Sequence, residues 1–478
     1  MRNPKTKFLI KIIFFVTIFI CNVIGSFIPE GRAGQEAILI GTQLYFMGGS
    51  RTIPSSNPIK SNIRGYNLSD EVFFLDLSSA FSTNNPPFVD LSDAGARMEF
   101  GNEKGSVVLG GANKDNVYLV GGTQQDLALL NKDDQNKTIT SNQTLMIEQI
   151  FNTYNATDQM IFLYRPASRA WSTLGQGVIG TQPTRRRTTS TVIDQNGKIY
   201  IFGGRVEFDM FSHTLILYND LYTFDTTLIK WEKIDAANAP SARSHATPIL
   251  LPSGKILYIG GVTQSAPGVQ TNLLPMTEPR VGHTATLTPN NKTIIILGGT
   301  TSYVLNQTVP QPNYLSLDIS KEPYQYSELK LSGNNPPYLS FHTTTLYSNY
   351  MIVAFGNITN DASPSYETSP NIYLLDVNCL AWANKFSTDS SSCPTPSPSS
   401  PSPSGPSIGL IVGLVLVGLF AIVVVAAIIW FIQKKVKKRK KSNILNAYPS
   451  NGYPSNGYPS NGYPSNGYPN GYRAESCA

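Results

Sequence analysis

The sequence has few charged residues, histidines and cysteines for its length. Only 14% of the 478 residues are charged, and there are four His and four Cys, against 38 Gly and 33 Pro. This balance favours a loop-rich β protein over a helical one. Between Phe27 and Pro406 acidic residues outnumber basic ones, which argues against a nucleic-acid partner. Neither an HExxH metal motif nor a Walker phosphate loop is present, so those two hydrolase classes are excluded.

Two uncharged apolar stretches predict how the chain meets a membrane. Ile12 to Ile20 follows basic residues and precedes small ones, as in a signal peptide. The stretch from Ile408 to Ile432 exceeds the ~20 residues that cross a bilayer. A basic cluster from Lys434 to Lys441 follows it and is expected on the cytoplasmic side. We therefore expect a single-pass plasma-membrane protein with its N-terminal part outside; retention of the first stretch as a second anchor is the alternative.

The remaining segments follow from composition. The Pro/Ser-rich stretch after Cys393 predicts a stiff stalk. Beyond Ala447 the sequence Tyr-Pro-Ser-Asn-Gly occurs four times, which predicts a disordered cytoplasmic tail that either binds a cytosolic partner or is a drifting repeat. The expected order is a signal peptide (1–26), an extracellular domain (27–392), a stalk (393–407), a transmembrane helix (408–432), a basic segment (433–446) and the tail (447–478).

The extracellular domain is built from repeats. Short β-branched and aromatic runs end in Gly-Gly, as expected for strands closed by a tight turn. A later strand ends in Asp, and an aromatic residue follows six positions on, as in Asp225 with Trp231 and Asp376 with Trp382. The Gly-Gly pairs end at Gly49, Gly122, Gly204, Gly261 and Gly299, with a degenerate sixth at Gly356.

These residues resemble the kelch-repeat family, including the propeller of galactose-oxidase-like proteins. The resemblance covers Arg32 to Phe386 and rests on the Gly-Gly pairs, the Asp-to-Trp spacing and the openings Arg243-Ser-His245 and Arg280-Val-Gly-His283. It implies an all-β fold in which each repeat is one four-stranded blade around a central axis. The fourth repeat is short and lacks an Asp-to-Trp unit. We expect about six blades with the fourth incomplete; a gap in the sequence is the alternative.

The cysteines and sequons agree with an external domain. Cys21 belongs to the expected signal peptide and Cys477 to the tail, which leaves Cys379 and Cys393 as the only cysteines of the expected external part, so we expect them to form a disulfide in an oxidising compartment. Seven N-x-S/T sequons predict N-glycosylation. They are at Asn67, Asn136, Asn142, Asn155, Asn291, Asn306 and Asn357.

The residues do not support an enzyme. The related copper radical oxidases need two His, two Tyr and a cross-linked Cys. His245, His283 and His342 come one per repeat opening, so we expect them spread around the ring. Asp225, Asp318 and Asp376 recur in phase, as turn caps do. We therefore expect no catalytic residue, no metal and no cofactor, and hold the oxidase as the less favoured alternative.

Long loops on a rigid scaffold indicate where a ligand binds. The loop after the third Gly-Gly has no sequon, and beside it lie Arg185 and Arg186. Arg with aromatic residues is typical of interface hot spots. We expect a protein or glycan to bind this receptor-like or adhesion-like face; a passive surface or wall tether is the alternative. The predicted contact residues are Arg185, Arg186, Phe208, Met210, Phe211 and His213.

Overall fold

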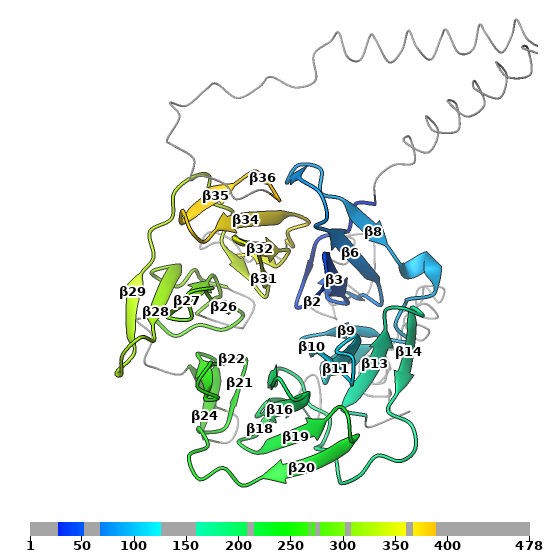
Figure 1. Ribbon diagram of the computed structural model, residues 1–478. Coiled ribbons are helices and arrows are strands. Elements are labelled where there is room, and N and C mark those ends of the chain that lie inside the picture. The colour runs from blue at the N-terminus through cyan, green and yellow to red at the C-terminus, as the bar shows by residue number, and fades with distance from the viewer. Residues whose placement is uncertain are drawn as a thin grey trace, which may run out of the picture. The chain divides into compact units, whose positions relative to one another are not determined.

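The computed structural model describes residues 27–51, 67–125, 159–207, 215–266, 269–272, 278–301, 307–359 and 367–388. These residues belong to one compact unit, Met1–Thr395. Its strands form a ring of sheets, so the prediction of an all-β propeller is confirmed (Figure 1). No helix among these ranges is long and apolar enough to span a membrane. The predicted span 408–432, the signal peptide and the tail lie outside the described residues.

The ring contains five four-stranded blades, not six. In each blade the strands are antiparallel and follow one another outward from the axis (Figure 1). We number the blades by their place in the ring as one, two, three, five and six. Their strands are β2 (Glu36–Ile40), β3 (Gln43–Met47), β6 (Val72–Asp76) and β8 (Phe88–Asp90); β10 (Ser106–Gly110), β11 (Asn116–Val120), β13 (Ile161–Arg165) and β14 (Ala170–Thr173); β15 (Ser190–Ile193), β16 (Lys198–Phe202), β19 (Leu221–Asp225) and β20 (Lys230–Ile234); β26 (Thr284–Leu287), β27 (Thr293–Leu297), β28 (Tyr314–Asp318) and β29 (Gln325–Glu328); β31 (Thr343–Tyr347), β32 (Tyr350–Ala354), β34 (Ile372–Asp376) and β35 (Ala381–Ala383).

A two-stranded sheet occupies the fourth place. It consists of β22 (Thr247–Leu250) and β23 (Ile256–Ile259). Strand β22 contacts the innermost strands of blades three and five, β15 and β26, and the remaining innermost strands contact one another in order around the ring. The expected incomplete repeat is therefore in its expected place, but the segment after Gly261 has too few residues to add a third and fourth strand to it.

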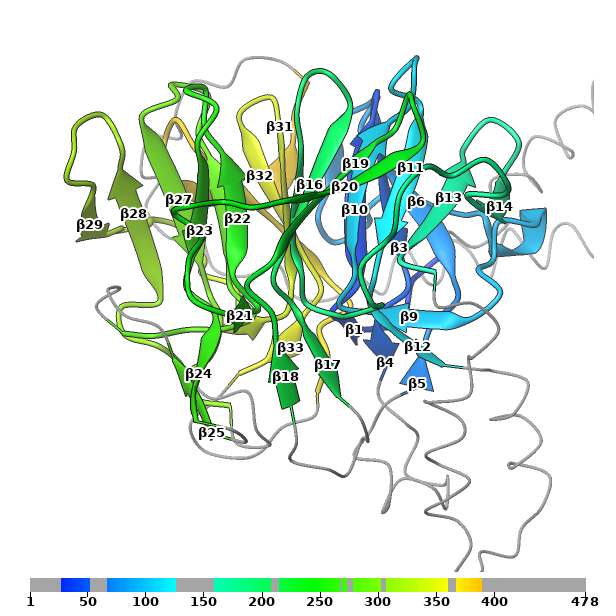
Figure 2. The same cartoon turned by 90° about the horizontal axis from the view of Figure 1, so that it is seen from below.

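Short sheets form a second tier on one side of the blades (Figure 2). In most of these sheets, the segment that opens a repeat pairs with the segment that follows the Gly-Gly of the same repeat. In another, the segment that follows the Gly-Gly forms a hairpin with itself. Strands β7 (Phe81–Ser82) and β36 (Lys385–Phe386) pair the first blade with the last. The second-tier strands are β1 (Arg32–Ala33), β4 (Ser50–Arg51) and β5 (Asn67–Leu68); β9 (Gly101–Glu103) and β12 (Thr123–Gln125); β17 (Arg205–Glu207) and β18 (Leu215–Leu217); β21 (Arg243–Ser244), β24 (Val262–Ala266) and β25 (Val269–Asn272); β30 (Leu339–Ser340) and β33 (Asn357–Ile358).

The Gly-Gly pairs fasten each repeat to the next. The backbone N–H of the second glycine donates to the carbonyl of the first residue in the next opening, and the sixth bond closes the ring. Both glycines have positive φ in the five Gly-Gly pairs, a conformation that glycine adopts without steric cost, and the sixth pair is Phe355-Gly356. The six bonds are Gly49 N to Asn102 O (2.7 Å), Gly122 N to Arg186 O (3.2 Å), Gly204 N to Arg243 O (2.9 Å), Gly261 N to Arg280 O (3.3 Å), Gly299 N to Leu339 O (2.8 Å) and Gly356 N to Arg32 O (2.7 Å).

The hydrophobic core lies between adjacent blades, as the repeat pattern predicted. Trp231 packs with Tyr118 of the preceding blade, and Trp382 packs with Ile295 and Leu297 of the blade before its own. The predicted turn caps are confirmed too, because Asp225 Oδ1 accepts the N–H groups of the two residues at positions 227 and 228. Asp318 and Asp376 cap their turns in the same way.

Candidate binding site

The residues that open the repeats meet at the propeller axis. We call the four residues before each innermost strand the opening and number them one to four. The third residue has positive φ in all six openings, which is uncommon for residues other than glycine. The openings are Arg32–Gln35, Asn102–Gly105, Arg186–Thr189, Arg243–Ala246, Arg280–His283 and Leu339–His342.

Backbone hydrogen bonds join the third residues into a collar around the axis. Each N–H in the set donates to the carbonyl of the third residue in the preceding opening. Since the bonds run between neighbouring openings, they hold these six segments in fixed positions. The bonds are Lys104 N to Gly34 O (2.7 Å), Thr188 N to Lys104 O (3.0 Å), His245 N to Thr188 O (3.2 Å), Phe341 N to Gly282 O (2.7 Å) and Gly34 N to Phe341 O (2.8 Å).

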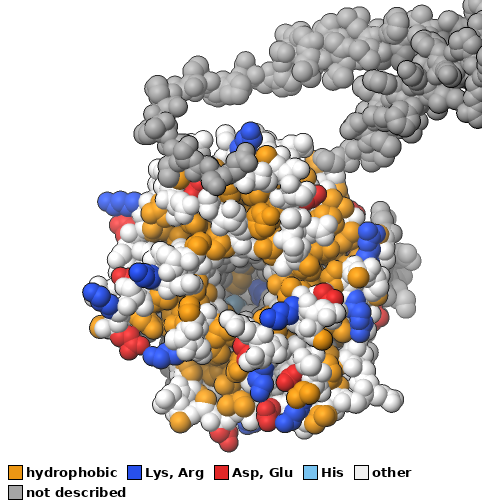
Figure 3. All heavy atoms as spheres, in the orientation of Figure 1, with side chains coloured by type: hydrophobic (Ala, Val, Ile, Leu, Met, Phe, Trp, Pro, Cys, Tyr) orange, Lys and Arg blue, Asp and Glu red, His pale blue; other side chains and the backbone are white. Residues whose placement is uncertain are grey.

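The collar surrounds a cavity of about 160 Å³. Its lining consists of the third and fourth residues of all six openings. Figure 3 shows the ring face hollowed at its centre, with His and Lys or Arg atoms inside the hollow. A larger cavity of about 370 Å³ lies at the seam between blades one and six, but no charged side chain lines it. We therefore take the axial pocket as the candidate site.

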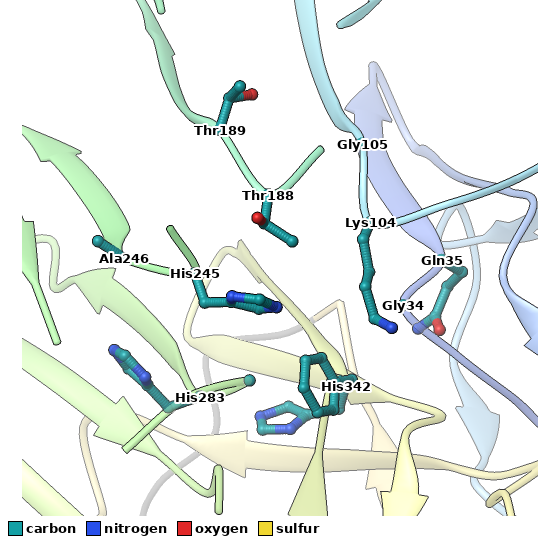
Figure 4. A pocket seen from close by; sticks show the side chains of 12 residues that line it. Gly34, Gln35, Lys104, Gly105, Thr188, Thr189, His245, Ala246, His283 and His342 are labelled. Carbon is teal, nitrogen blue, oxygen red and sulfur yellow. The ribbon is translucent and has the colours of Figure 1, made fainter. Parts of the chain in front are cut away.

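Lys104, Phe341 and His245 supply most of the chemistry of the axial pocket. The Lys104 Nζ lies 5.2 Å from the centre of the Phe341 ring and 3.0 Å from Glu103 Oε1. The His245 ring meets the Phe341 ring edge-on at 6.0 Å. A Cβ on Gly282 would stand 2.9 Å from the Phe341 ring, so a glycine there leaves the room that the ring occupies. The pocket thus offers a cation, an aromatic face and an imidazole (Figure 4).

Three histidines line this one pocket, and the expectation that they are spread around the ring is wrong. The openings converge on the axis, so one residue per repeat still gathers there. The three are also not equivalent, because His245 is a third residue whereas His283 and His342 are fourth residues. Even so, the described residues contain no group of three or more His, Cys, Asp or Glu that could hold a metal ion.

Burial keeps the pocket histidines neutral. It lowers the pKa of His283 to about 3, with Arg280 and His342 adding to the effect. It lowers the pKa of His342 to about 4. His342 Nε2 lies 2.9 Å from Thr284 Oγ1, and the backbone of Ile259 and Arg280 interacts with the His283 ring. Each neutral imidazole carries one donor and one acceptor, so the rings can take either role toward a ligand.

Positive charge gathers on one side of the pocket. The pKa of His245 is lowered by burial first and then by Arg205, Lys104 and Arg187, which places all three cations near its ring. Arg187 pairs with Arg205 through the backbone, and its Nη1 donates to Thr123 Oγ1 at 3.0 Å. This basic sector belongs to blades two and three.

The structure separates the two arginines predicted as contacts. Arg185 is half-buried, and its Nη1 donates to Gln124 Oε1 at 2.7 Å. Arg186 is 5% exposed, is held by Asp220 at 2.5 Å and donates to Gly203 O at 3.2 Å. Arg186 is therefore a structural residue, equivalent to the buried Arg32 and Arg280, and its prediction as a contact is wrong. The other predicted contacts, Phe208, Met210, Phe211 and His213, lie outside the described residues.

Cys379 and three sequons are within the described ranges. Cys379 forms a disulfide, whose predicted partner Cys393 lies outside the described residues. Asn291 is exposed in the turn between β26 and β27. Asn67 and Asn357 lie in the second-tier strands β5 and β33. The remaining sequons are outside, and glycosylation stays a prediction; they are Asn136, Asn142, Asn155 and Asn306.

A family model described as the Attractin/LZTR1 beta-propeller matches residues 150–399, just over half of the 478 residues. The chain belongs to this family. The matched part of the propeller begins before β13 of blade two and includes every later blade. The expected kelch-type propeller is thereby confirmed. Among solved structures, one titled "Structure of YjhT" is similar with 14% identity, covering 62% of this chain and 84% of that chain at a TM-score of 0.43. No curated protein matches the chain.

Lys104 and Phe341 were missed from the sequence. The first residue of an opening varies between Arg, Asn and Leu, so the second and sixth openings lack the Arg that marks the others. The third residue of an opening can be found by counting from the residue whose carbonyl accepts the Gly-Gly N–H. Only the structure shows which residue that is. One signal was available, because each opening lies directly before the first apolar strand of its repeat.

Proposed function

We propose that this chain is a membrane-anchored surface protein whose propeller recognises a partner outside the cell through its axial pocket. The observation that carries the proposal is the convergence of all six openings on one pocket, where Lys104 and Phe341 stand beside three neutral histidines. Membership of a propeller family supports a recognition module. The collar fixes the backbone of the pocket before any ligand arrives, which lowers the entropic cost of binding.

The partner that suits this pocket is a protein that presents an acidic side chain. Lys104, Arg187 and Arg205 lie together near His245, and a carboxylate accepts hydrogen bonds from such cations. A cavity of about 160 Å³ has room for a side chain rather than for a folded segment. We infer that the basic sector and Arg185 extend the contact beyond the pocket, while a glycan ligand is the alternative.

Anchoring by residues 408–432, with the propeller outside and the sequons glycosylated, completes the proposal. Its support is the uncharged stretch itself and the basic cluster after it. A protein with this arrangement would present its propeller to other cells or to the extracellular matrix. The alternative function, a passive surface or wall tether, would have the same anchoring and differ only in having no ligand.

The test is a capture experiment with the full chain. Purified protein is screened against arrays of cell-surface proteins and of glycans, and the captured partner is titrated against variants. The double variant Lys104→Gln with Arg185→Gln should lose about thirtyfold in affinity, as for hot-spot losses of ~2 kcal/mol. Melting temperatures establish that the variants are folded.

The matched control is Lys198→Gln with Lys255→Gln. Both lysines adjoin the turns between first and second strands, away from the openings. An equal loss from both pairs would show nonspecific charge attraction. If the double variant of Lys104 and Arg185 binds the captured partner as strongly as the parent protein does, a role for the pocket is contradicted. Capture of nothing from either array would favour the passive tether.

A further inference from the structure

A carboxylate replaces a hydroxyl in one of six equivalent places around the axis. The residue that follows each opening is the first of the innermost strand, and in five repeats it is Ser or Thr. Its hydroxyl contacts the fourth residue of the next opening. In blade one this residue is Glu36, whose Oε1 accepts the N–H of Gly105 at 2.6 Å. The other five contacts are Ser106 to Thr189 O (3.3 Å), Ser190 to Ala246 O (2.9 Å), Thr247 to His283 O (3.2 Å), Thr284 to His342 Nε2 (2.9 Å) and Thr343 to Gln35 Nε2 (3.3 Å).

A second carboxylate stands in the opening next to Glu36. Glu103 is the second residue of that opening, where the other five openings have Ala, Arg, Ser, Val and Ser. Glu36 is 4% exposed and Glu103 is 2% exposed. Their charges interact, since Glu103 contributes to the raised pKa of Glu36. Two buried acids are thus close to each other. In the other repeats, a Ser or Thr takes the place of Glu36, and a small or basic residue takes the place of Glu103.

The unsatisfied groups here include three acceptors, and Gln124 Nε2, on the strand β12 that pairs with Asn102, is an unsatisfied donor. Glu36 Oε2, Glu103 Oε2 and Asn102 Oδ1 are buried and have no hydrogen-bond partner among the described residues. Asn102 is fully buried. A Cβ placed on Gly105 would lie 2.9 Å from Glu36 Oε1 and 3.2 Å from Asn102 Oδ1, so the Glu36 carboxylate and the Asn102 amide converge. A buried acceptor without a donor costs free energy, and a buried carboxylate costs more.

We propose that Glu36, Glu103 and the Asn102 carboxamide form a site for a hard cation, with calcium as the ion that it takes. Calcium prefers carboxylate and amide oxygens, whereas nitrogen and sulfur ligands suit softer metals. The ion would satisfy the three oxygens that no N–H reaches. Lys104 Nζ stays on the other oxygen of Glu103. The pocket lining includes Gly34, Lys104 and Gly105, and the Lys104 and Gly105 backbone follows Glu103 directly in the sequence.

Such an ion would connect two blades next to the pocket. Glu36 begins β2 of blade one, and Glu103 ends β9 directly before blade two. Burial, with Glu103 as a smaller cause, raises the pKa of Glu36 to about 8. A cation between the carboxylates would offset both effects. The site would therefore stabilise this junction and orient Lys104 for the proposed ligand, although cation binding itself does not depend on that ligand.

The experiment follows thermal unfolding of the full chain in detergent, after treatment with a chelator. Calcium chloride is titrated up to about 10 mM, since extracellular sites have Kd values of ~0.1–1 mM. Sodium chloride of equal ionic strength and magnesium chloride are run in parallel. We expect the melting temperature to rise by a few degrees and to saturate with calcium, because a ligand that binds only the folded state stabilises it.

The variant Glu36→Thr gives blade one the residue that three other repeats have at this place. It should fold and lose the calcium response, and Glu103→Gln should lose it as well and serves if the first variant does not fold. Glu232→Gln, an exposed acid on β20, should keep it. A parent protein that does not respond to calcium would overturn the proposal, as would a Glu36→Thr protein that responds like the parent. Parental stability that changes with pH around 8 but not with calcium would show that a shared proton satisfies the oxygens instead.

Discussion

Replacement of Gly121 by Ala tests how much the Gly-Gly fastening contributes to the propeller. Gly121 has a φ of +65°, and a Cβ there would lie 2.2 Å from the carbonyl oxygen of Arg186. The same carbonyl accepts the N–H of Gly122 at 3.2 Å. A left-handed conformation costs an L-residue about 1–2 kcal/mol. Displacing the carbonyl costs about 0.5–1.5 kcal/mol for the hydrogen bond. We expect the free energy of unfolding to fall by roughly 1.5–3.5 kcal/mol.

Gly41→Ala is the matched control. Gly41 has a φ of +60°, and nothing lies within 4 Å of the position of an added Cβ. This variant pays for the backbone conformation alone, about 1–2 kcal/mol. The difference between the two variants isolates the contact between repeats. The sixth repeat has Phe355 at the equivalent position with a φ of +61°, so a side chain is tolerated where the neighbouring segment has adjusted.

Equilibrium unfolding in urea, followed by tryptophan fluorescence, measures both variants. Trp171 and Trp231 lie in the blades on either side of the contact between Gly121 and the third opening. The reasoning is refuted if Gly41→Ala and Gly121→Ala lower the free energy of unfolding equally. It is also refuted if the Gly121 variant is the more stable of the two.

Two further measurements test the pocket and the topology. His283 has a pKa lowered to about 3, so the folded state binds its proton less readily than the unfolded state, and stability is lost as the pH falls from about 6.5 toward 3. His283→Gln should therefore lose less free energy of unfolding between pH 7 and pH 4 than the parent, and an unchanged loss would contradict the assignment. Protease added to intact cells should remove the propeller and spare an epitope at Ala478; digestion of the tail with the propeller protected would reverse the orientation.

The repeat pattern predicted the ring because its signals are local. Gly-Gly pairs, Asp-capped turns and Trp residues each act within a few residues of where they stand, so their spacing carries over to the blades. The fourth repeat lacks the Asp-to-Trp unit, which is also a local signal, so its shortage of strands could be predicted from the sequence. The number of blades was overestimated because the fourth repeat, which keeps its Gly-Gly, was counted as an incomplete blade, and it forms a two-stranded sheet instead.

The axial pocket could not be predicted in the same way. Its third residues include Lys104, Thr188, His245 and Phe341, which share no chemistry but share a positive φ. That conformation is imposed by the collar, which joins segments far apart in sequence. Arg186 is a residue that was predicted as a contact but is buried. It is one of three consecutive arginines, and the sequence alone does not show which of them the fold buries.

The Gly-Gly bonds run through the fourth repeat, and the collar reaches its opening, although the repeat lacks outer strands. Gly261 still donates to Arg280 O, and His245 still donates to Thr188 O. The closure of the ring and the pocket are therefore made by the inner hairpins and openings alone. The outer half of a blade can therefore be absent while the inner strands and openings keep the geometry of the axial pocket.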